Sequence, residues 1–279
     1  AGLPCDMERI KQLAVKYNLD IVEDAAHALG ATYNDGSRVG NCQYSNMTIF
    51  SFHPVKGIAA GEGGMITTND FDIYRKLTLL RSHGITKGNF EFPGVSRPDN
   101  SLINKDDALE NGELKRWYYE MQSLGFNYRI TDIQSALAIS QMDKIDLFLD
   151  ARKSIAKRYD KAFKGVPNIT PLQTLGRDNS SHHIYVVSID FDKISMTRHQ
   201  FMEELAEQGI GSQVHYIPVV NHPYYQKLQY NLEALPVVKE YYKTVLSIPL
   251  YYDLSRIEVN KIVEAVCELL VGIKFDQNK

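Results

Sequence analysis

The sequence is poor in cysteine and in excess charge of either sign. Its three cysteines, Cys5, Cys42 and Cys267, are far apart and form no Cys-x-x-Cys pair, so neither a zinc site nor a disulfide framework is predicted. We expect reduced thiols, as in a cytoplasmic protein. The formal net charge is only -3, which gives no electrostatic footprint for nucleic acid or for an anionic membrane surface.

Long apolar runs and low-complexity segments are also missing. No run approaches the roughly 18 apolar residues of a membrane span, and no internal repeat or Gly/Ser-rich linker interrupts the 279 residues. Hydrophobic residues make up 44% of the chain and charged residues 23%, as is ordinary for a globular protein. These absences favour a folded enzyme or binding domain over a membrane or nucleic-acid-binding protein.

The first half of the chain alternates between helix and strand patterns. Asp6 precedes an apolar stripe with helical spacing, and residues 19–22 read as a buried strand. Two further strands are predicted at 47–50 and 65–68, followed by a helix over 71–81. Helix and strand in alternation predict a doubly wound α/β domain with a mixed sheet.

The second half predicts a smaller α+β domain. Thr131 opens a capping box, and a single long helix is predicted from about Asp132 to Phe163. Strands are predicted over 182–189 and 212–216, and a second capping box begins at Thr197. A last helix begins after Ser255, with the following residues expected to face inward: Val259, Ile262, Val263, Val266, Leu270 and Ile273.

A polar stretch separates these two halves. Residues 87–113 are rich in Gly, Pro, Asp and Asn, which predicts a long loop inside a compact domain. The aromatic residues Trp117, Tyr118 and Tyr119 follow it. We interpret them as packing residues, because aromatic side chains dominate protein cores.

Lys56 is the strongest candidate for chemistry. It lies in a glycine-rich connection between two apolar strands, where burial would disfavour its ammonium form and favour a Schiff base. Asp24 follows an earlier strand, and ligands collect beyond the carboxyl ends of strands in α/β sheets. This pair suits pyridoxal 5′-phosphate (PLP), which needs a lysine for its aldehyde and an acid for its pyridine nitrogen. The alternative for Lys56 is a solvent-exposed surface lysine, and the alternative for Asp24 is a helix N-cap.

Four ordered motifs carry a family resemblance. The runs EDAAHALGA, SFHPVKGIAAGEGG, SLGFNYRITDIQSAL and QVHYIPV resemble the DegT/StrS-type sugar aminotransferases, which are fold-type I PLP enzymes. The resemblance extends essentially from end to end. It implies that residues 1–130 are the C-terminal part of a large PLP-binding domain, that 131–165 form a linking helix, and that 166–279 form a small C-terminal domain. On the order of a hundred further residues, preceding the region of this chain, are expected in family members.

The resemblance also implies roles for individual residues. Lys56 corresponds to the Schiff-base lysine, with Asp24 as pyridinium partner, His27 beside the cofactor ring and Ser51 on its phosphate. Asn127 corresponds to a residue that reaches the cofactor phosphate of a neighbouring subunit, which implies a homodimer with a shared active site. The substrate-binding positions implied are Gln213, Val214, His215, Tyr216 and Arg129.

Each of these residues has a structural alternative. His27 and His215 could be histidines packed in the core. Ser51 and Asn127 could serve only as hydrogen-bond partners for backbone groups, and Arg129 could form a surface ion pair. His182 and His183 are adjacent, but no acid or cysteine spacing supports a metal site.

The implied reaction is the transfer of an amino group from glutamate to C4 of a UDP-linked 4-keto-6-deoxy sugar. Within the family, the resemblance is to members that act in pseudaminic acid biosynthesis. Two alternatives stay open: a PLP-dependent sugar dehydratase, in which histidine replaces the lysine, and a non-catalytic remnant or partner subunit. Lys56 argues against the dehydratase.

Overall fold

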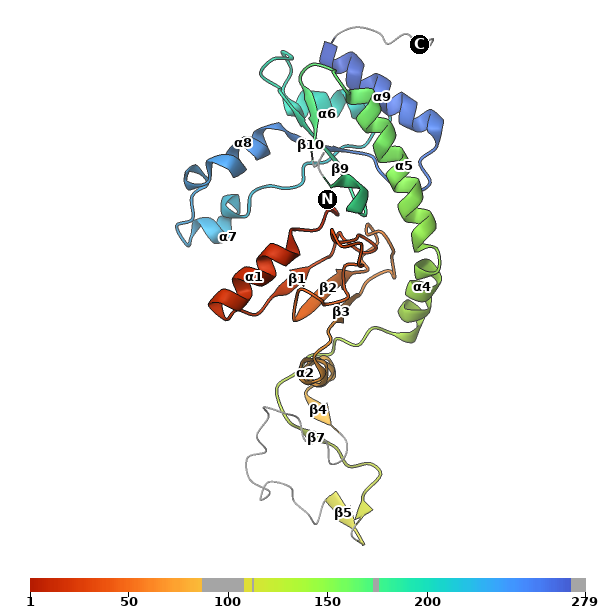
Figure 1. Cartoon of the computed structure of the whole chain (residues 1–279), viewed down its shortest axis with the longest axis vertical. Coiled ribbons are helices and arrows are strands. Elements are labelled where there is room, and N and C mark those ends of the chain that lie inside the picture. Colours follow the sequence, from red (N-terminus) through yellow and green to blue (C-terminus); the bar gives the residue numbers. More distant parts are fainter. Residues whose placement is uncertain (87–107, 112, 173–175, 272–279) are drawn as a thin grey trace.

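The computed structural model describes residues 1–86, 108–111, 113–172 and 176–271. Within these ranges the chain forms two three-stranded sheets and two short two-stranded ones. In Figure 1 the sheet β1–β3, with strands between residues 22 and 67, lies below the sheet β8–β10, with strands between residues 169 and 248. The helices α4 (Asp132–Met142) and α5 (Ile145–Phe163) run beside both sheets. None of the helices in these ranges is long and apolar enough to cross a membrane.

The first sheet has the order β1 (Val22–Asp24), β2 (Met47–Ser51) and β3 (Gly64–Thr67). β1 is parallel to β2, whereas β3 is antiparallel to it. The two later strands match their predictions closely.

The predicted strand over 19–22 is wrong in position, because the C-terminal cap of the preceding helix uses the backbone groups at its start. Asn18 caps α1 (Met7–Tyr17) in the left-handed conformation, and the Leu19 N–H bonds to the Ala14 carbonyl at 2.9 Å. The Ile21 N–H is taken by the Asn46 side chain at 2.8 Å. Pairing with β2 therefore begins only at Val22.

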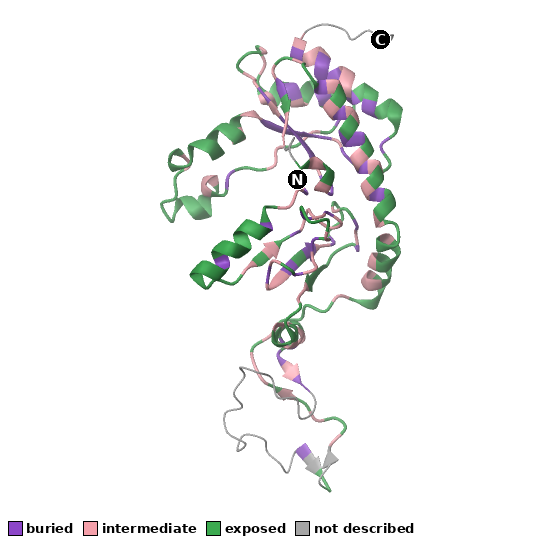
Figure 2. Cartoon of the chain, viewed as in Figure 1, coloured by how far each residue is buried: buried purple, intermediate pink, exposed green. Residues whose placement is uncertain are grey.

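The apolar stripe of α1 is only partly covered. Asp6 caps the helix as predicted, accepting from the Arg9 N–H at 3.2 Å. Met7 and Ala14 are buried, but Leu13 and Tyr17 are 50% and 60% exposed. Figure 2 shows α1 as largely exposed, in contrast to α5 (Ile145–Phe163) and α9 (Arg256–Val271), which carry many buried residues.

The core beneath the first sheet is small. Phe50, Phe52, Ile58 and Tyr33 are buried together, and Phe148 joins them from α5 (Ile145–Phe163). The linking helix therefore helps to close the core of the sheet that carries Lys56.

Residues 71–126 include an arm that extends away from both sheets (Figure 1). It contains α2 (Phe71–Arg81), the pair β4 (Ile85–Thr86) and β7 (Glu120–Met121), and the hairpin β5 (Leu109–Glu110) and β6 (Glu113–Leu114). Most of the loop predicted over 87–113 lies outside the described residues.

The aromatic residues at the end of this arm do not pack as predicted. Trp117 and Tyr119 are 64% and 58% exposed, because the described residues of the arm form only two-stranded sheets and provide no second layer over these rings. Tyr118 is half-buried, and its hydroxyl donates to Glu120 at 2.8 Å. The interpretation of these aromatic residues as packing residues is therefore wrong for Trp117 and Tyr119.

The single helix predicted over 132–163 is also wrong. It is divided into α4 (Asp132–Met142) and α5, with Asp143 and Lys144 between them. The Lys144 N–H bonds to the Gln141 carbonyl at 3.1 Å, one residue closer than the helical pattern. α5 contributes buried residues to both cores, whereas α4 has no buried residue and meets the first core through the partly buried Ala138.

The second sheet is antiparallel, in the order β10 (Val245–Ile248), β9 (Tyr185–Ile189) and β8 (Ile169–Pro171). Its core is filled by α5, α6 (Arg198–Glu207) and α9 (Arg256–Val271). Fully buried side chains include Tyr159, Phe201, Leu205, Leu246 and Val266. α7 (Pro223–Gln226) and α8 (Pro236–Thr244) lie in the connection to β10.

Two predicted strands of this half need correction. The strand predicted over 182–189 begins only at Tyr185, because His182 has a φ of 49° and the N–H of His183 bonds to the Ala1 carbonyl at 3.1 Å. The strand predicted over 212–216 is a single bridge between Gln213 and Ser247. One pair of hydrogen bonds at the end of a sheet does not make a strand.

The last helix largely matches its prediction. Ser255 caps it, since the Glu258 N–H donates to Ser255 Oγ at 3.2 Å and the Ser255 N–H to Glu258 Oε2 at 2.8 Å. Of the residues predicted to face inward, Val259, Ile262, Val266 and Leu270 are buried and Val263 is partly buried. Ile273 lies outside the described residues.

Candidate active site

Lys56 lies on a tightly held connection between β2 and β3. Phe52 is buried at its start, where its N–H bonds to the Gly63 carbonyl at 2.8 Å and its carbonyl accepts from the Ala60 N–H at 3.0 Å. The Lys56 N–H bonds to the His53 carbonyl at 2.9 Å. The side chain is half-buried rather than fully buried. The backbone beneath this amine is therefore fixed by local bonds, as the glycine-rich sequence predicts.

Asp24 lies at the end of the neighbouring strand. The parallel register pairs Asp24 with Ile49, so the carboxyl ends of β1 and β2, and with them Asp24 and Ser51, meet at one edge of the sheet. The Asp24 carboxylate is exposed and accepts from the Ala26 N–H at 3.1 Å. It thus caps the following turn while keeping acceptor capacity for a ligand.

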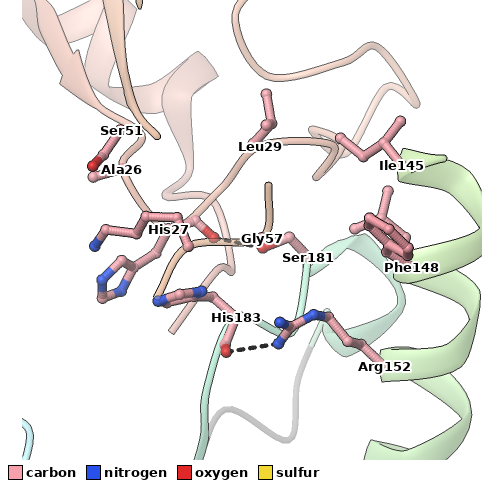
Figure 3. Close-up of a pocket in the computed structure, with 12 residues that line it drawn as sticks. Ala26, His27, Leu29, Ser51, Gly57, Ile145, Phe148, Arg152, Ser181 and His183 are labelled. Carbon is pink, nitrogen blue, oxygen red and sulfur yellow. Dashed lines mark hydrogen bonds between the residues drawn. The ribbon is translucent and has the colours of Figure 1, made fainter. Parts of the chain in front are cut away.

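A cavity beyond this edge brings several of the predicted residues together. Lys56, His27 and Ser51 line it, along with Arg152 of α5 and His183. Figure 3 shows these side chains converging from both halves of the chain. The imidazole rings of His27 and His183 are 4.1 Å apart between centroids, with planes tilted by 43°.

Burial sets the charge of these histidines. Burial first, and then the charge of the nearby Lys56, lower the pKa of His27 to about 4. Burial also lowers the pKa of His183 to about 2, with His27 and Arg152 contributing. Both imidazoles are therefore neutral near pH 7, and each can donate from one nitrogen and accept at the other.

The 213–216 run approaches the same site from the second half. Nδ1 of His215 is hydrogen-bonded to Ser247 Oγ at 2.8 Å, and the Tyr241 hydroxyl donates to the His215 carbonyl at 3.0 Å. Burial lowers the pKa of His215, and Lys56 adds to the shift, so the two side chains are electrostatically coupled. Gln213 and Tyr216 are exposed, and Val214 is half-buried.

Asn127 and Arg129 do not line the cavity around Lys56. Asn127 pairs with Ser82 at the end of α2, and both predicted residues are exposed. They lie on the segment that leads from the arm into α4. Within a single chain, the structure therefore separates these two residues from the other predicted site residues.

Sequence reasoning missed His183 and Arg152. His183 was considered only as a metal ligand, and the described residues contain no cluster suited to a metal ion. Arg152 carried a detectable signal: it falls on the apolar stripe of α5, four residues after Phe148 and three before Ile155. A charged residue on a buried stripe requires a specific partner.

Comparison with known proteins identifies one matching family. Residues 1–267 match the model of the DegT/DnrJ/EryC1/StrS aminotransferase family. The spore coat polysaccharide biosynthesis protein SpsC of Bacillus subtilis is 36% identical over 97% of this chain. The UDP-4-amino-4,6-dideoxy-N-acetyl-beta-L-altrosamine transaminase of Helicobacter pylori is 32% identical over 99% of it. The match covers 65% of each of these relatives.

Solved structures give the same fold. PseC of Helicobacter pylori, an aminotransferase of pseudoaminic acid biosynthesis, has a TM-score of 0.80 at 30% identity, over 97% of this chain and 64% of that one. The PLP form of Spr1654 from Streptococcus pneumoniae, a sugar aminotransferase by its description, has a TM-score of 0.78 at 28% identity, over 95% of this chain and 65% of that one. The predicted fold-type I α/β architecture is confirmed.

Proposed function

Since the chain belongs to the DegT/DnrJ/EryC1/StrS aminotransferase family, we propose that it acts as a PLP-dependent aminotransferase. The donor is glutamate and the acceptor is C4 of a UDP-linked 4-keto-6-deoxy sugar. The observation that carries this proposal is the gathering of Lys56, His27 and Ser51 around one cavity, beside the exposed carboxylate of Asp24.

The residues present fit PLP. Lys56 would hold the cofactor through Nζ, the Asp24 carboxylate would pair with its pyridine nitrogen, and Ser51 Oγ would donate to its phosphate. His27, neutral at pH 7, would donate to its ring hydroxyl. When bound, PLP supplies an electron sink for the bond changes at the substrate carbon.

The chain's own residues then handle protons and orientation. Lys56 Nζ would move the proton at the carbon that gains or loses the amino group. His215 is positioned by Ser247 and would donate to an oxygen of the nucleotide sugar. The Helicobacter pylori relative, named for a UDP-amino sugar, supports a UDP-linked substrate.

We also propose a homodimer in which Asn127 and Arg129 serve the partner's site. Their segment exposes Leu124 at 85%, Tyr128 at 73% and Ile133 at 83%, and apolar surface of this extent favours association. The test is complementation: a mixture of Lys56→Ala and Asn127→Ala chains regains turnover only if one subunit completes the site of the other. Mixtures as inactive as the single variants would reject the shared site.

Two further expectations follow from family membership. We propose the division into 1–130, 131–165 and 166–279, supported by separate buried clusters before and after the middle of α5. We also propose a cytoplasmic location, supported by three free thiols at Cys5, Cys42 and Cys267.

The deciding experiment traps PLP on the chain with borohydride and measures intact mass and the modified peptide. We expect one cofactor-sized adduct on Lys56, absent from Lys56→Ala and retained in Lys16→Ala, which removes an exposed lysine of α1. An adduct spread over several lysines, or none, would reject Lys56 as the cofactor lysine.

A turnover assay separates the catalytic proposal from the non-catalytic alternative. Glutamate and a UDP-linked 4-keto sugar are supplied to the chain alone, and to the chain with a polypeptide equivalent to the unmatched part of the Helicobacter pylori relative. Formation of 2-oxoglutarate in either mixture supports the aminotransferase. No product in both would favour a partner or remnant role.

A further inference from the structure

Arg152 is a buried cation whose partners are carbonyl groups. It is 7% exposed and lies on α5 between the two cores. No carboxylate lies within ion-pair distance of its guanidinium in the ranges that the structure describes. Burial accordingly lowers its pKa. A buried charge that lacks a counter-ion is costly, so its retention requires a structural or functional reason.

The guanidinium joins three segments of the chain. Nη1 approaches the carbonyl oxygens of His183 at 3.0 Å, Leu250 at 2.9 Å and His182 at 3.3 Å. These carbonyls belong to the backbone just before β9 and just after β10. Arg152 therefore fixes both segments against the linking helix, as charge-assisted hydrogen bonds do.

His183 is placed by this clamp rather than by bonds of its own ring. Its side chain is 8% exposed, and its Nδ1 is buried with no hydrogen-bonding partner among the described residues. The same holds for Nε of Arg152. The ring of His183 is instead packed against that of His27, as Figure 3 shows beside the clamp.

We propose that Arg152 is a positioning residue of the active site. By holding the His183 backbone, it fixes the His183 ring behind His27 and so sets the ring of His27 at the cavity that Lys56 lines. The link from Arg152 to His27 depends only on the geometry above, whereas its consequence for PLP rests on the proposed function.

The link itself is tested without cofactor, by NMR of histidine-labelled chain. In Arg152→Lys the shorter side chain loses the clamp, and we expect the His27 ring signal to shift and its pKa to rise from about 4 toward the ordinary 6.5. Lys56, the amino group of Ala1, His215 and Asp24 also act on the pKa of His27 and are unchanged in this variant. The matched control is Lys157→Met on the same helix, which removes an exposed cation paired with Asp178.

A second variant covers the case in which Arg152→Lys does not fold. His183→Ala keeps the clamp, since Arg152 contacts only the backbone carbonyl at that position, but removes the ring behind His27. It should produce the same rise in the pKa of His27. A folded variant of either kind with an unchanged His27 signal would overturn the proposal.

The consequence for the cofactor is tested by a double-mutant cycle on PLP affinity. Each single substitution should weaken PLP binding about tenfold, as the loss of one aromatic contact worth about 1.4 kcal/mol would. The double variant should be no weaker than either single one, because both act through the same ring. Additive losses would overturn positioning through His183.

The two proposals fail in different ways. If the His27 signal shifts in Arg152→Lys or His183→Ala while the unsubstituted chain forms no borohydride adduct on Lys56, the link to His27 is supported and the cofactor role is rejected. If the unsubstituted chain forms an adduct on Lys56 while the His27 signal is unchanged in both variants, the cofactor role is supported and the link to His27 is rejected.

Discussion

Ser181 Oγ donates a 2.5 Å hydrogen bond to the carbonyl oxygen of His27, across 154 residues of sequence. Gly2 lies against the same bond and accepts from the Ser181 N–H at 3.0 Å. The turn that follows Asp24 is therefore held by the segment before β9, so the two halves of the chain meet directly at the candidate cofactor site.

Gly2→Ala should destabilise the chain through this junction. Gly2 has a φ of +104°, and an added Cβ would lie 2.3 Å from Ser181 Oγ and 3.0 Å from the His27 carbonyl oxygen. Backbone strain of this kind costs about 1–3 kcal/mol, and the steric overlap adds to it. Urea unfolding measures the loss.

The matched control is Gly36→Ala, where φ is +83° but no heavy atom lies within 4 Å of the added Cβ. It carries the backbone strain alone. Equal losses of stability in the two variants would show that the contact with Ser181 has no energetic weight.

Gln134→Ala should affect both stability and cofactor capture. The Gln134 side chain accepts from the Thr131 N–H at 3.1 Å, and its Nε2 donates to the Glu62 carbonyl at 3.0 Å. Loss of the reciprocal capping bond costs about 1 kcal/mol, whereas the Thr131 cap itself remains. Loss of the second bond frees the glycine-rich connection after Lys56, so PLP capture should slow.

Gln200→Ala provides the control, because Gln200 fills the same capping position on α6. We expect a similar loss in thermal stability with no change in the rate of PLP capture. If both variants captured PLP at the same rate, the bond to Glu62 would have no role in holding Lys56.

Stability should fall as the pH is lowered below about 6.5. Burial lowers the pKa of His27 and His182 to about 4, and that of His183 to about 2. Between these values and 6.5, the unfolded chain binds protons that the folded chain does not, so unfolding takes up protons. The free energy of unfolding, measured in urea from pH 5 to 7, should rise with pH.

His183→Asn should remove at least one proton from this uptake at pH 5, because one buried imidazole is lost and the pKa of His27 should rise as well. The comparison is His199→Asn, which replaces an exposed histidine of α6. An unchanged pH dependence in the first variant would mean that His183 is not buried in its neutral form.

Helix starts could be predicted from the sequence because their hydrogen bonds are local. The capping boxes at Thr131 and Thr197 form as predicted, as does the cap at Ser255. The same holds for β2 and β3, whose apolar runs flank Lys56 closely in sequence. That Asp24 and Ser51 meet at one edge of the sheet follows from the order of strands, since parallel neighbours end at one edge.

Several of the failed predictions depend on distant contacts. α5 contributes buried residues to both cores whereas α4 has none, the short β9 reflects the bonds of residues 181–183 to the first two residues, and the exposure of Trp117 reflects the lack of a covering layer among the described residues of the arm. No local pattern specifies these contacts.

The sequence by itself determined the family, the helix caps and the lysine on its glycine-rich connection, because motif spacing and backbone capping act over a few residues. Only the tertiary structure decided that His183 lies behind His27 and that Arg152 clamps it in place. That arrangement brings side chains of α5, the approach to β9 and the turn after β1 into one cavity, and burial then fixes their charge.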